Sequence, residues 1–256
     1  MKITIDKIKS MKGNEKISML TAYDYCTARI VDEAGIDIVL IGDSLGMVVL
    51  GFETTQKVTM QDMIRHTGAV ARGIKNTHVV ADMPYNSYDN EEDAIKNGKL
   101  LSDVGADSVK NEKKPEIAKI LVENGVNVMG HIGLTPQTIT DFKVQGKNEE
   151  AAKQLKEESI ALENAGCYAL ILECIPMQLA KEITELIKIP TIGIGAGPYC
   201  DGQVLVSSDM LGLFTDFKPK FVKRYAEISK EMKKGIENYK KDVKEGKFPT
   251  DEFSFH

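Results

Sequence analysis

The stretch of sequence that decides the fold is Gly35-Ile-Asp-Ile-Val-Leu-Ile-Gly-Asp-Ser-Leu-Gly46. A glycine suited to ending a helix leads into a short apolar run, and the run ends at Asp43 and a flexible turn. Strands of a parallel sheet read as continuous apolar runs because both of their faces are buried, and a left-handed glycine commonly closes the helix before them. The stretch therefore predicts one strand of a parallel sheet with Asp43 at its polar end.

The same pattern recurs along the chain. An apolar core followed by an ionisable residue is found at 105–112, 125–131 and 166–173, each after a glycine, and at 77–82 without one. These segments end in the polar residues Asp82, Lys110 with Glu112, His131 and Glu173. A chain of 256 residues has the usual length of a (β/α)8 barrel, in which the carboxyl ends of all strands meet at one face. We therefore predict a single α/β domain over residues 1–256, a TIM barrel with one shared site.

The remaining elements are predicted from periodicity and capping residues. A short helix over 4–12 should cover the bottom of the barrel, and residues 17–23 should form the first strand. Thr59 with Asp62 three residues later predicts a helix cap, and Pro115 is placed to open a helix. The eighth strand falls at either 203–206 or 210–213, and a basic amphipathic helix over 221–239 forms a C-terminal extension.

Composition narrows the class of function. The chain has 42% hydrophobic residues, and 33 basic against 38 acidic residues give a net charge of -5 without a basic, aromatic-rich cluster, so we expect no nucleic-acid partner. The sequence shows no apolar run of membrane-spanning length and no signal peptide, so we expect no membrane contact. Four cysteines without a Cys-x-x-Cys pair fit a reducing compartment, which predicts four buried thiols in a cytoplasmic protein.

Asp43, Asp82 and Glu112 are the candidate metal ligands. Each lies at the end of a different predicted strand, and three converging buried carboxylates are tolerated mainly around a cation. Hard oxygen donors favour Mg²⁺, and the absence of cysteine from the set disfavours zinc. The alternative for each carboxylate is a structural role, in which it caps a helix or pairs with a lysine.

Three further polar residues are candidates for binding or proton transfer. Lys110 lies on the same side of its strand as Glu112, and it can bind a substrate carboxylate, form a Schiff base or pair with Glu112. Glu173 follows apolar residues that raise a carboxyl pKa toward the range useful for proton transfer, but a structural carboxylate is the alternative. His131 can donate to a ligand oxygen or serve as a hydrogen-bonded core residue.

Several short strings are more specific than these patterns, and they lie in order along the chain: Leu20-Thr-Ala-Tyr-Asp-Tyr25, Gly42-Asp-Ser-Leu-Gly-Met47, Ala81-Asp-Met-Pro84, Gly130-His-Ile-Gly-Leu-Thr-Pro-Gln137, Lys143-Val-Gln-Gly146, Leu172-Glu-Cys174, Gly193-Ile-Gly-Ala-Gly197 and Ser254-Phe-His256. Together they resemble the ketopantoate (3-methyl-2-oxobutanoate) hydroxymethyltransferase family of pantothenate biosynthesis. The resemblance runs from about Lys2 to His256. It implies a (β/α)8 barrel of the phosphoenolpyruvate/pyruvate superfamily, assembled as a homodecamer.

The resemblance also implies roles for individual residues. Mg²⁺, one ion per subunit, would be held by Asp43, Asp82 and Glu112. The 2-oxo acid would be bound by Asp43, Ser44, Asp82 and Lys110, with His131 nearby, and Glu173 would be the catalytic proton acceptor. The one-carbon donor would be 5,10-methylenetetrahydrofolate, and the reaction would pass through a Mg²⁺-stabilised enolate.

Two features depart from the pattern that the resemblance implies. The family usually has an aliphatic residue before the glutamate of the fourth strand and two glycines after it, whereas this chain has Asn111 and Lys113-Lys114. The loop before Lys143 is also shorter than usual. A lyase or mutase of the same superfamily and a non-catalytic barrel are the alternative functions. The first is disfavoured by the full-length resemblance, and the second by the presence of all three metal carboxylates and Glu173.

Overall fold

The computed structural model describes residues 2–138 and 143–256, and the chain falls into two compact units, Met1–Val206 and Ser207–His256. The first unit is a closed parallel barrel whose strands neighbour one another in chain order, with the last strand paired to the first. Its strands are β1 (Ile17–Thr21), β2 (Ile38–Ile41), β3 (His78–Asp82), β4 (Ser108–Glu112), β5 (Val128–Gly133), β6 (Ala169–Glu173), β7 (Thr191–Ile194) and β8 (Gly202–Leu205). The predicted TIM barrel is confirmed.

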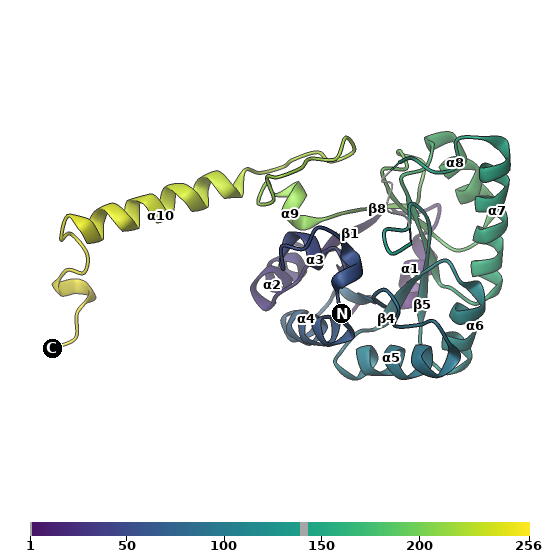
Figure 1. Ribbon diagram of the computed structural model, residues 1–256, viewed down its shortest axis with the longest axis horizontal. Coiled ribbons are helices and arrows are strands. Elements are labelled where there is room, and N and C mark those ends of the chain that lie inside the picture. The colour runs from purple at the N-terminus through teal and green to yellow at the C-terminus, as the bar shows by residue number, and fades with distance from the viewer. Residues whose placement is uncertain (1, 139–142) are drawn as a thin grey trace. The chain divides into compact units, whose positions relative to one another are not determined.

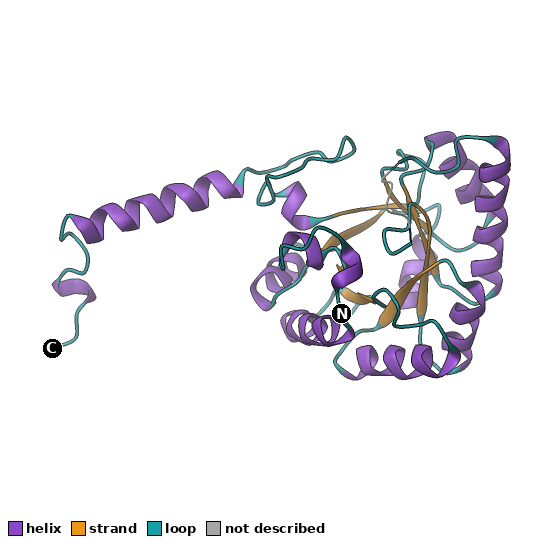
Figure 2. Cartoon of the chain, viewed as in Figure 1, coloured by secondary structure: helices purple, strands orange, loops and turns teal. Residues whose placement is uncertain are grey.

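Helices between the strands surround this barrel, as Figure 1 and Figure 2 show. They are α2 (Tyr25–Glu33), α4 (Met60–Gly73), α5 (Glu91–Asp103), α6 (Pro115–Glu123), α7 (Glu149–Asn164) and α8 (Met177–Leu186). Thr59 and Asp62 form the predicted reciprocal cap of α4, and Pro115 occupies the first turn of α6, where its missing N–H leaves no bond unmade. Local capping chemistry therefore places these helix starts.

The barrel is closed at its N-terminal end by α1 (Ile5–Met11). Thr4 caps this helix by accepting from the Lys7 amide at 3.3 Å, and Ile8 and Met11 pack into the core beside Ile17 and Met19 of the first strand. Both helix residues are almost completely buried, and each such side chain contributes about 1.5–3 kcal/mol of apolar burial. The predicted helix over 4–12 is confirmed as a bottom cover. Its role is packing.

The long connection after β2 contains the short helix α3 (Leu45–Val48) and the 3-10 turn η1 (Thr55–Lys57). The first alternative for the eighth strand is confirmed, because β8 spans Gly202–Leu205 whereas Met210 belongs to the short helix α9 (Ser207–Met210). The loop before Lys143, which is shorter than the resemblance implies, includes residues 139–142, and these lie outside the described part of the chain.

The second unit contains α9, the long helix α10 (Ile228–Lys244) and the 3-10 turn η2 (Asp251–Phe253). The predicted start of the C-terminal helix at Phe221 is wrong. Tyr225 and Ile228 donate their amides to the carbonyls of Met210 and Leu211 at 2.9 Å, so this segment is bonded to an earlier turn and the helix begins after it. Within the described residues no helix combines the length and apolarity needed to cross a membrane. The assignment of 1–256 to one domain stays a prediction.

Candidate active site

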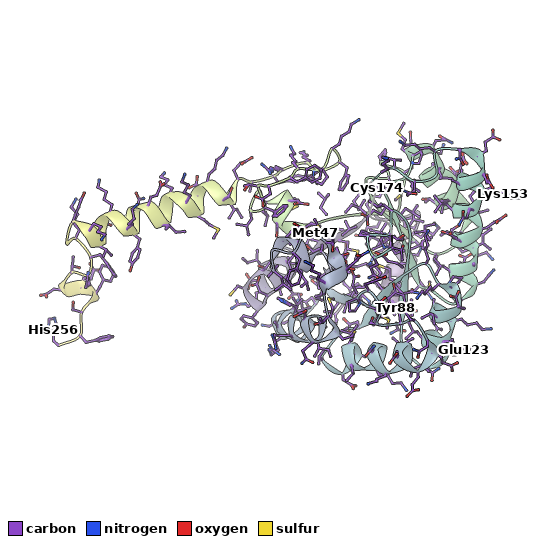
Figure 3. All side chains as sticks on the ribbon, viewed as in Figure 1. Met47, Tyr88, Glu123, Lys153, Cys174 and His256 are labelled. Atoms are coloured by element: carbon purple, nitrogen blue, oxygen red, sulfur yellow. The ribbon has the colours of Figure 1, made fainter. Side chains whose placement is uncertain are left out.

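The strand register brings the predicted site residues together at the carboxyl ends of β3 to β6. Asp82 of β3 lies beside Lys110 of β4, Glu112 lies beside His131 of β5, and Gly133 lies beside Glu173 of β6. Gly133 has a φ of +98°, and a Cβ atom at this position would collide with the carbonyl oxygen of Glu173, so the close approach of the two strand ends requires glycine. Figure 3 labels Tyr88 and Cys174, which follow β3 and β6.

Asp43 and Asp82 form the acidic side of the site. Both are buried, and the Asp43 amide donates to Oδ2 of Asp82 at 3.0 Å. Burial, followed by repulsion from Asp82 and Glu112, raises the pKa of Asp43 well above its usual range. Oδ1 of Asp82 is buried without a well-formed hydrogen bond to any described residue, although it lies 3.0 Å from the Lys110 ammonium. This half of the site has a surplus of negative charge.

Lys110 is the buried cation of the site. Its Nζ lies 3.0 Å from Oδ1 of Asp82 and 3.3 Å from Nδ1 of His131. Burial alone lowers the pKa of a lysine, but the charges of the surrounding carboxylates outweigh burial here and raise the Lys110 pKa above its ordinary value. Lys110 is therefore an ammonium ion at neutral pH, which favours carboxylate binding and disfavours a nucleophilic amine.

His131 connects the metal-side carboxylates to Glu173. Its Nδ1 lies 3.5 Å from Oε1 of Glu112, and its Nε2 lies 3.2 Å from Oε2 of Glu173. Burial and the Lys110 charge lower the pKa of His131, but its two carboxylate partners outweigh them and raise it. Glu173 keeps an 18% exposed side chain, whereas that of Glu112 is 2% exposed. Among the carboxylates Asp43, Asp82, Glu112 and Glu173 of this site, Glu173 is thus the most accessible to solvent.

Ser44 lies beside Asp43 and is positioned by a tyrosine that was not assigned from the sequence. The Ser44 hydroxyl is 2.9 Å from the hydroxyl of buried Tyr23, and the Tyr23 carbonyl is 2.6 Å from Nδ1 of His66. Tyr23 belongs to the Leu20–Tyr25 string, whose place after the first strand was the available signal. Two more buried residues at this face, Tyr88 and Gln137, were also not assigned, although Gln137 ends the string that follows β5.

The residues present fit a hard divalent cation. Asp43, Asp82 and Glu112 are three buried carboxylates with one buried lysine to balance them, and Asp82 retains an unsatisfied oxygen. Within residues 2–138 and 143–256 no three or more His, Cys, Asp or Glu side chains are gathered closely enough to hold a metal ion by themselves, so a cation here would need water or substrate oxygens as further ligands. An ion that keeps several water or substrate oxygens and takes few protein ligands is Mg²⁺, so the donor set suits it better than zinc.

The structure explains why Asn111 and Lys113-Lys114 occur together. Lys113 and Lys114 have φ values of +54° and +49°, which glycine adopts freely and lysine adopts at a cost of about 1–2 kcal/mol each. The fully buried Asn111 donates its Nδ2 to both of their carbonyls, at 2.9 and 3.3 Å. The Lys114 ammonium also pairs with Asp89 at 2.7 Å. The amide of Asn111 therefore holds a turn that the usual glycines would form unaided.

This interpretation predicts energetic coupling between Asn111 and the two lysines. Asn111→Leu should lower the free energy of unfolding by about 1–3 kcal/mol, because the Lys113 carbonyl loses its Asn111 donor and the Lys114 carbonyl keeps only the amides of Ile117 and Ala118. In the Lys113→Gly/Lys114→Gly background, Asn111→Leu should lower the free energy of unfolding by less. The difference between the two losses, measured by denaturant unfolding, is the coupling energy, and we expect about 0.5–3 kcal/mol.

The Lys113→Ala/Lys114→Ala background is the matched control for this cycle. It removes the same side chains, including the ion pair to Asp89, without giving the backbone the freedom of glycine. The coupling should therefore be absent or small in this background. Equal losses from Asn111→Leu in all three backgrounds would contradict the interpretation.

The four cysteines differ in burial more than expected. Cys167 and Cys200 are buried thiols, but Cys174 is half-buried and Cys26 is exposed near the start of α2, so the prediction of four buried thiols is wrong. Cys26 lies in the first turn of α2, two residues after the capping residue Asp24. Burial, followed by the charge of Glu173, raises the pKa of the Cys174 thiol to about 12, which makes it a poor nucleophile beside the site.

Comparison with known proteins agrees with this arrangement. Residues 2–251 match the family described as ketopantoate hydroxymethyltransferase. The 3-methyl-2-oxobutanoate hydroxymethyltransferase of Clostridium botulinum (strain Loch Maree / Type A3) is 52% identical over 264 residues, covering 100% of this chain and 96% of that protein.

Solved structures with low sequence identity share the fold. A 2,3-dimethylmalate lyase of the PEP mutase/isocitrate lyase superfamily has a TM-score of 0.61 at 14% identity, covering 100% of this chain and 93% of that one. A phosphonopyruvate hydrolase in complex with oxalate and Mg²⁺ has a TM-score of 0.64 at 10% identity, covering 100% and 92%. The closed barrel of this chain therefore has the same fold as these two proteins.

Proposed function

The chain belongs to the ketopantoate hydroxymethyltransferase family, and from this premise we propose that it transfers a hydroxymethyl group to 3-methyl-2-oxobutanoate, giving 2-dehydropantoate for pantothenate biosynthesis. The observation that carries the proposal is the buried cluster of Asp43, Asp82, Lys110, Glu112 and His131 at the carboxyl ends of neighbouring strands, with Glu173 beside it. A family match over 2–251 supports the same activity.

The proposed cofactor is one Mg²⁺ per subunit, held by Asp43, Asp82 and Glu112. Bound there, the ion would act as a Lewis acid toward the oxygens of the 2-oxo acid and so stabilise the enolate. The burial of all three carboxylates, and the repulsion from Asp82 and Glu112 that with burial raises the pKa of Asp43, support this assignment. The phosphonopyruvate hydrolase of the same fold, which was solved with oxalate and Mg²⁺, is a weaker support because it shares only 10% identity.

The side chains around this site have separate tasks in the proposed reaction. The Lys110 ammonium binds the substrate carboxylate, and the Ser44 hydroxyl, oriented by Tyr23, donates to the same ligand. His131 holds Glu173 in place through its Nε2. Glu173 transfers a proton, either by taking it from C3 of the 2-oxo acid or by giving one to the folate nitrogen as the methylene bridge opens. A positioned carboxylate of this kind contributes about 10²- to 10⁴-fold to the rate.

The proposed one-carbon donor is 5,10-methylenetetrahydrofolate. C3 of the 2-oxo acid loses a proton and forms a bond to the methylene carbon, and water supplies the hydroxyl oxygen. Both carbon–nitrogen bonds of the methylene bridge break, and the proton from C3 and one proton of the water end on the two folate nitrogens. The one-carbon unit keeps its oxidation level, so no redox partner is needed. The family resemblance supports this donor.

Exchange of the C3 proton in D₂O tests the proposal directly. NMR should show loss of the C3–H signal of 3-methyl-2-oxobutanoate with enzyme and Mg²⁺ but without folate, and much slower loss after treatment with EDTA. Addition of 5,10-methylenetetrahydrofolate should then give 2-dehydropantoate. A protein that catalyses neither exchange nor hydroxymethyl transfer with Mg²⁺ present would contradict the proposed function.

Lys110 provides a test that separates carboxylate binding by an ammonium group from imine formation by an amine. A charged lysine cannot attack the ketone, so borohydride added with 3-methyl-2-oxobutanoate should neither inactivate the enzyme nor add substrate mass. Lys110→Ala should raise the KM for the 2-oxo acid by about 10²-fold, because a charge-assisted bond to its carboxylate is lost. Lys119, an exposed lysine paired within its own helix, is a matched control whose change to alanine should have no effect. Covalent trapping at Lys110 would favour imine chemistry.

The proposed assembly is a homo-oligomer, a decamer as the family resemblance implies, located in the cytoplasm. Helix α10 carries apolar side chains at three- and four-residue spacing, and Met232, Ile236 and Tyr239 are 50%, 64% and 60% exposed. Such a stripe supports association through this helix. Light scattering of the purified protein should give a mass near ten times 28.3 kDa.

A further inference from the structure

Gln137 is buried at the mouth of the site, and all four of its backbone and side-chain polar groups are hydrogen-bonded. It is 2% exposed and lies in the loop after β5. Its side-chain Nε2 donates to Oδ2 of Asp43 at 2.8 Å and to the Met83 carbonyl at 2.9 Å. Its carbonyl accepts from Nε2 of Gln56 at 2.9 Å. One residue therefore joins the loops that follow β2, β3 and β5.

Two of these bonds end on proposed metal ligands. The amide Nε2 uses Oδ2 of Asp43, and the backbone N–H of Gln137 donates to Oε2 of Glu112 at 3.1 Å. Oδ1 of Asp43 and Oε1 of Glu112 take no part in these two bonds. A neutral donor on one oxygen fixes the direction of the second oxygen without adding charge to the site. The two ligands, which come from different strands, are thus oriented by one residue.

Tyr88 determines which way the Gln137 amide points. The Tyr88 hydroxyl donates to Oε1 of Gln137 at 2.5 Å and accepts from the Glu112 amide at 3.3 Å. A tyrosine hydroxyl is ordinarily protonated at neutral pH, so Tyr88 has the proton that it donates to Oε1 of Gln137. With Oε1 held by this proton, the NH₂ group faces the Asp43 carboxylate. The opposite orientation would set two oxygens against each other.

We propose that Gln137 is a positioning residue that presets Asp43 and Glu112 for a divalent cation, with Tyr88 fixing the orientation of its amide. This inference rests on the metal site in the proposed function and adds a residue that does not itself ligate. A preset site binds its ion more tightly because the ligands lose less freedom on binding.

Binding of Mn²⁺ to the protein without substrate, followed by electron paramagnetic resonance, tests the proposal. Mn²⁺ accepts the same oxygen ligands as Mg²⁺ and reports occupancy independently of turnover. Gln137→Met keeps the length of the side chain but removes its donors, and it should weaken Mn²⁺ binding about 10- to 100-fold. Tyr88→Phe removes one orienting hydrogen bond and should weaken binding by a smaller factor, about 2- to 10-fold.

Gln56→Met is the matched control. It removes the bond to the Gln137 carbonyl and leaves the side-chain amide and the backbone N–H in place, so Mn²⁺ affinity should stay within about 2-fold. Thermal unfolding in EDTA checks that each variant is folded. At saturating Mg²⁺ the kcat of Gln137→Met should return toward the wild-type value, because the defect lies in cation occupancy.

The outcomes separate this inference from the function on which it rests. A wild-type protein that binds no Mn²⁺ would overturn both the metal site and the role of Gln137. A wild-type protein that binds Mn²⁺ while folded Gln137→Met binds it equally well would overturn only the role of Gln137. Equal weakening by Gln56→Met and Gln137→Met would assign the effect to loop anchoring and would also overturn it. If Gln137→Met does not fold, unchanged affinity in Tyr88→Phe would count against the proposal.

Discussion

Asp82→Ala is expected to abolish the Mg²⁺-dependent exchange of the C3 proton of 3-methyl-2-oxobutanoate, a loss of about 10²- to 10³-fold or more. Asp82 is central to the site, because it accepts from the Asp43 amide at 3.0 Å and lies 3.0 Å from the Lys110 ammonium. Its removal takes away one ligand and leaves a buried lysine without its nearest counter-charge. Asp43→Ala and Glu112→Ala should lose exchange in the same way, since we expect the three carboxylates to act as one site.

Asp107→Asn is the matched control for this series. Asp107 accepts the Val79 amide at 2.8 Å and precedes β4, so it lies at the opposite end of the strand from Glu112. The substitution also removes one carboxylate charge, but it should leave exchange and its Mg²⁺ dependence unchanged. NMR exchange rates with and without Mg²⁺, together with circular dichroism, provide the measurements. If two of the three alanine variants kept near-normal exchange, the metal assignment would be wrong.

Glu173→Gln is expected to lower kcat by about 10²- to 10⁴-fold while leaving the binding of the 2-oxo acid and of Mn²⁺ nearly unchanged. Glu173 contacts Nε2 of His131 at 3.2 Å, and His131 lies between it and Glu112. The amide keeps the size of the side chain and its place beside His131. It cannot accept the proton, so the loss should fall on turnover.

Cys174→Ala is the matched control for Glu173. It changes the neighbouring side chain, a half-buried thiol with a raised pKa, and should leave kcat unchanged. Steady-state kinetics separates kcat from KM, and Mn²⁺ titration measures the metal. Unchanged turnover in Glu173→Gln, or loss of Mn²⁺ binding in that variant, would count against a proton-transfer role. If Glu173→Gln lost hydroxymethyl transfer but kept exchange of the C3 proton, the proton that Glu173 transfers would be the one on the folate nitrogen.

The sequence by itself determined the strands and the residues at their ends. Buried parallel strands are continuous apolar runs, and a run such as Val39 to Ile41 is visible without knowledge of its neighbours. In a barrel all strand ends face one side, so Asp43, Asp82 and Glu112 could be grouped before any contact was known. Helix starts at Thr59 and Pro115 were equally local, because a cap involves only three or four residues.

Features that depend on distant backbone segments were decided by the tertiary structure. The C-terminal helix starts at Ile228, and not at Phe221, because the residues between them bond to Met210 and Leu211. The bonds of Asn111 reach only to the carbonyls of Lys113 and Lys114, but they depend on the left-handed turn at these two lysines, which the sequence did not indicate. Neither result follows from the periodicity of the segment concerned.

The contacts within the site were also decided only by the fold. Parallel strands in a barrel are staggered, and the stagger sets Glu112 against His131 and Gly133 against Glu173, which no single strand pattern specifies. Gln137 reaches Asp43, a residue 94 positions earlier, because the loop after β5 returns over the ends of β2 to β4. Local sequence patterns determine which polar residue stands at the end of each strand. The strand register and the path of the loops determine which residues these polar groups contact, because register and loop path depend on how all the strands pair in the closed barrel.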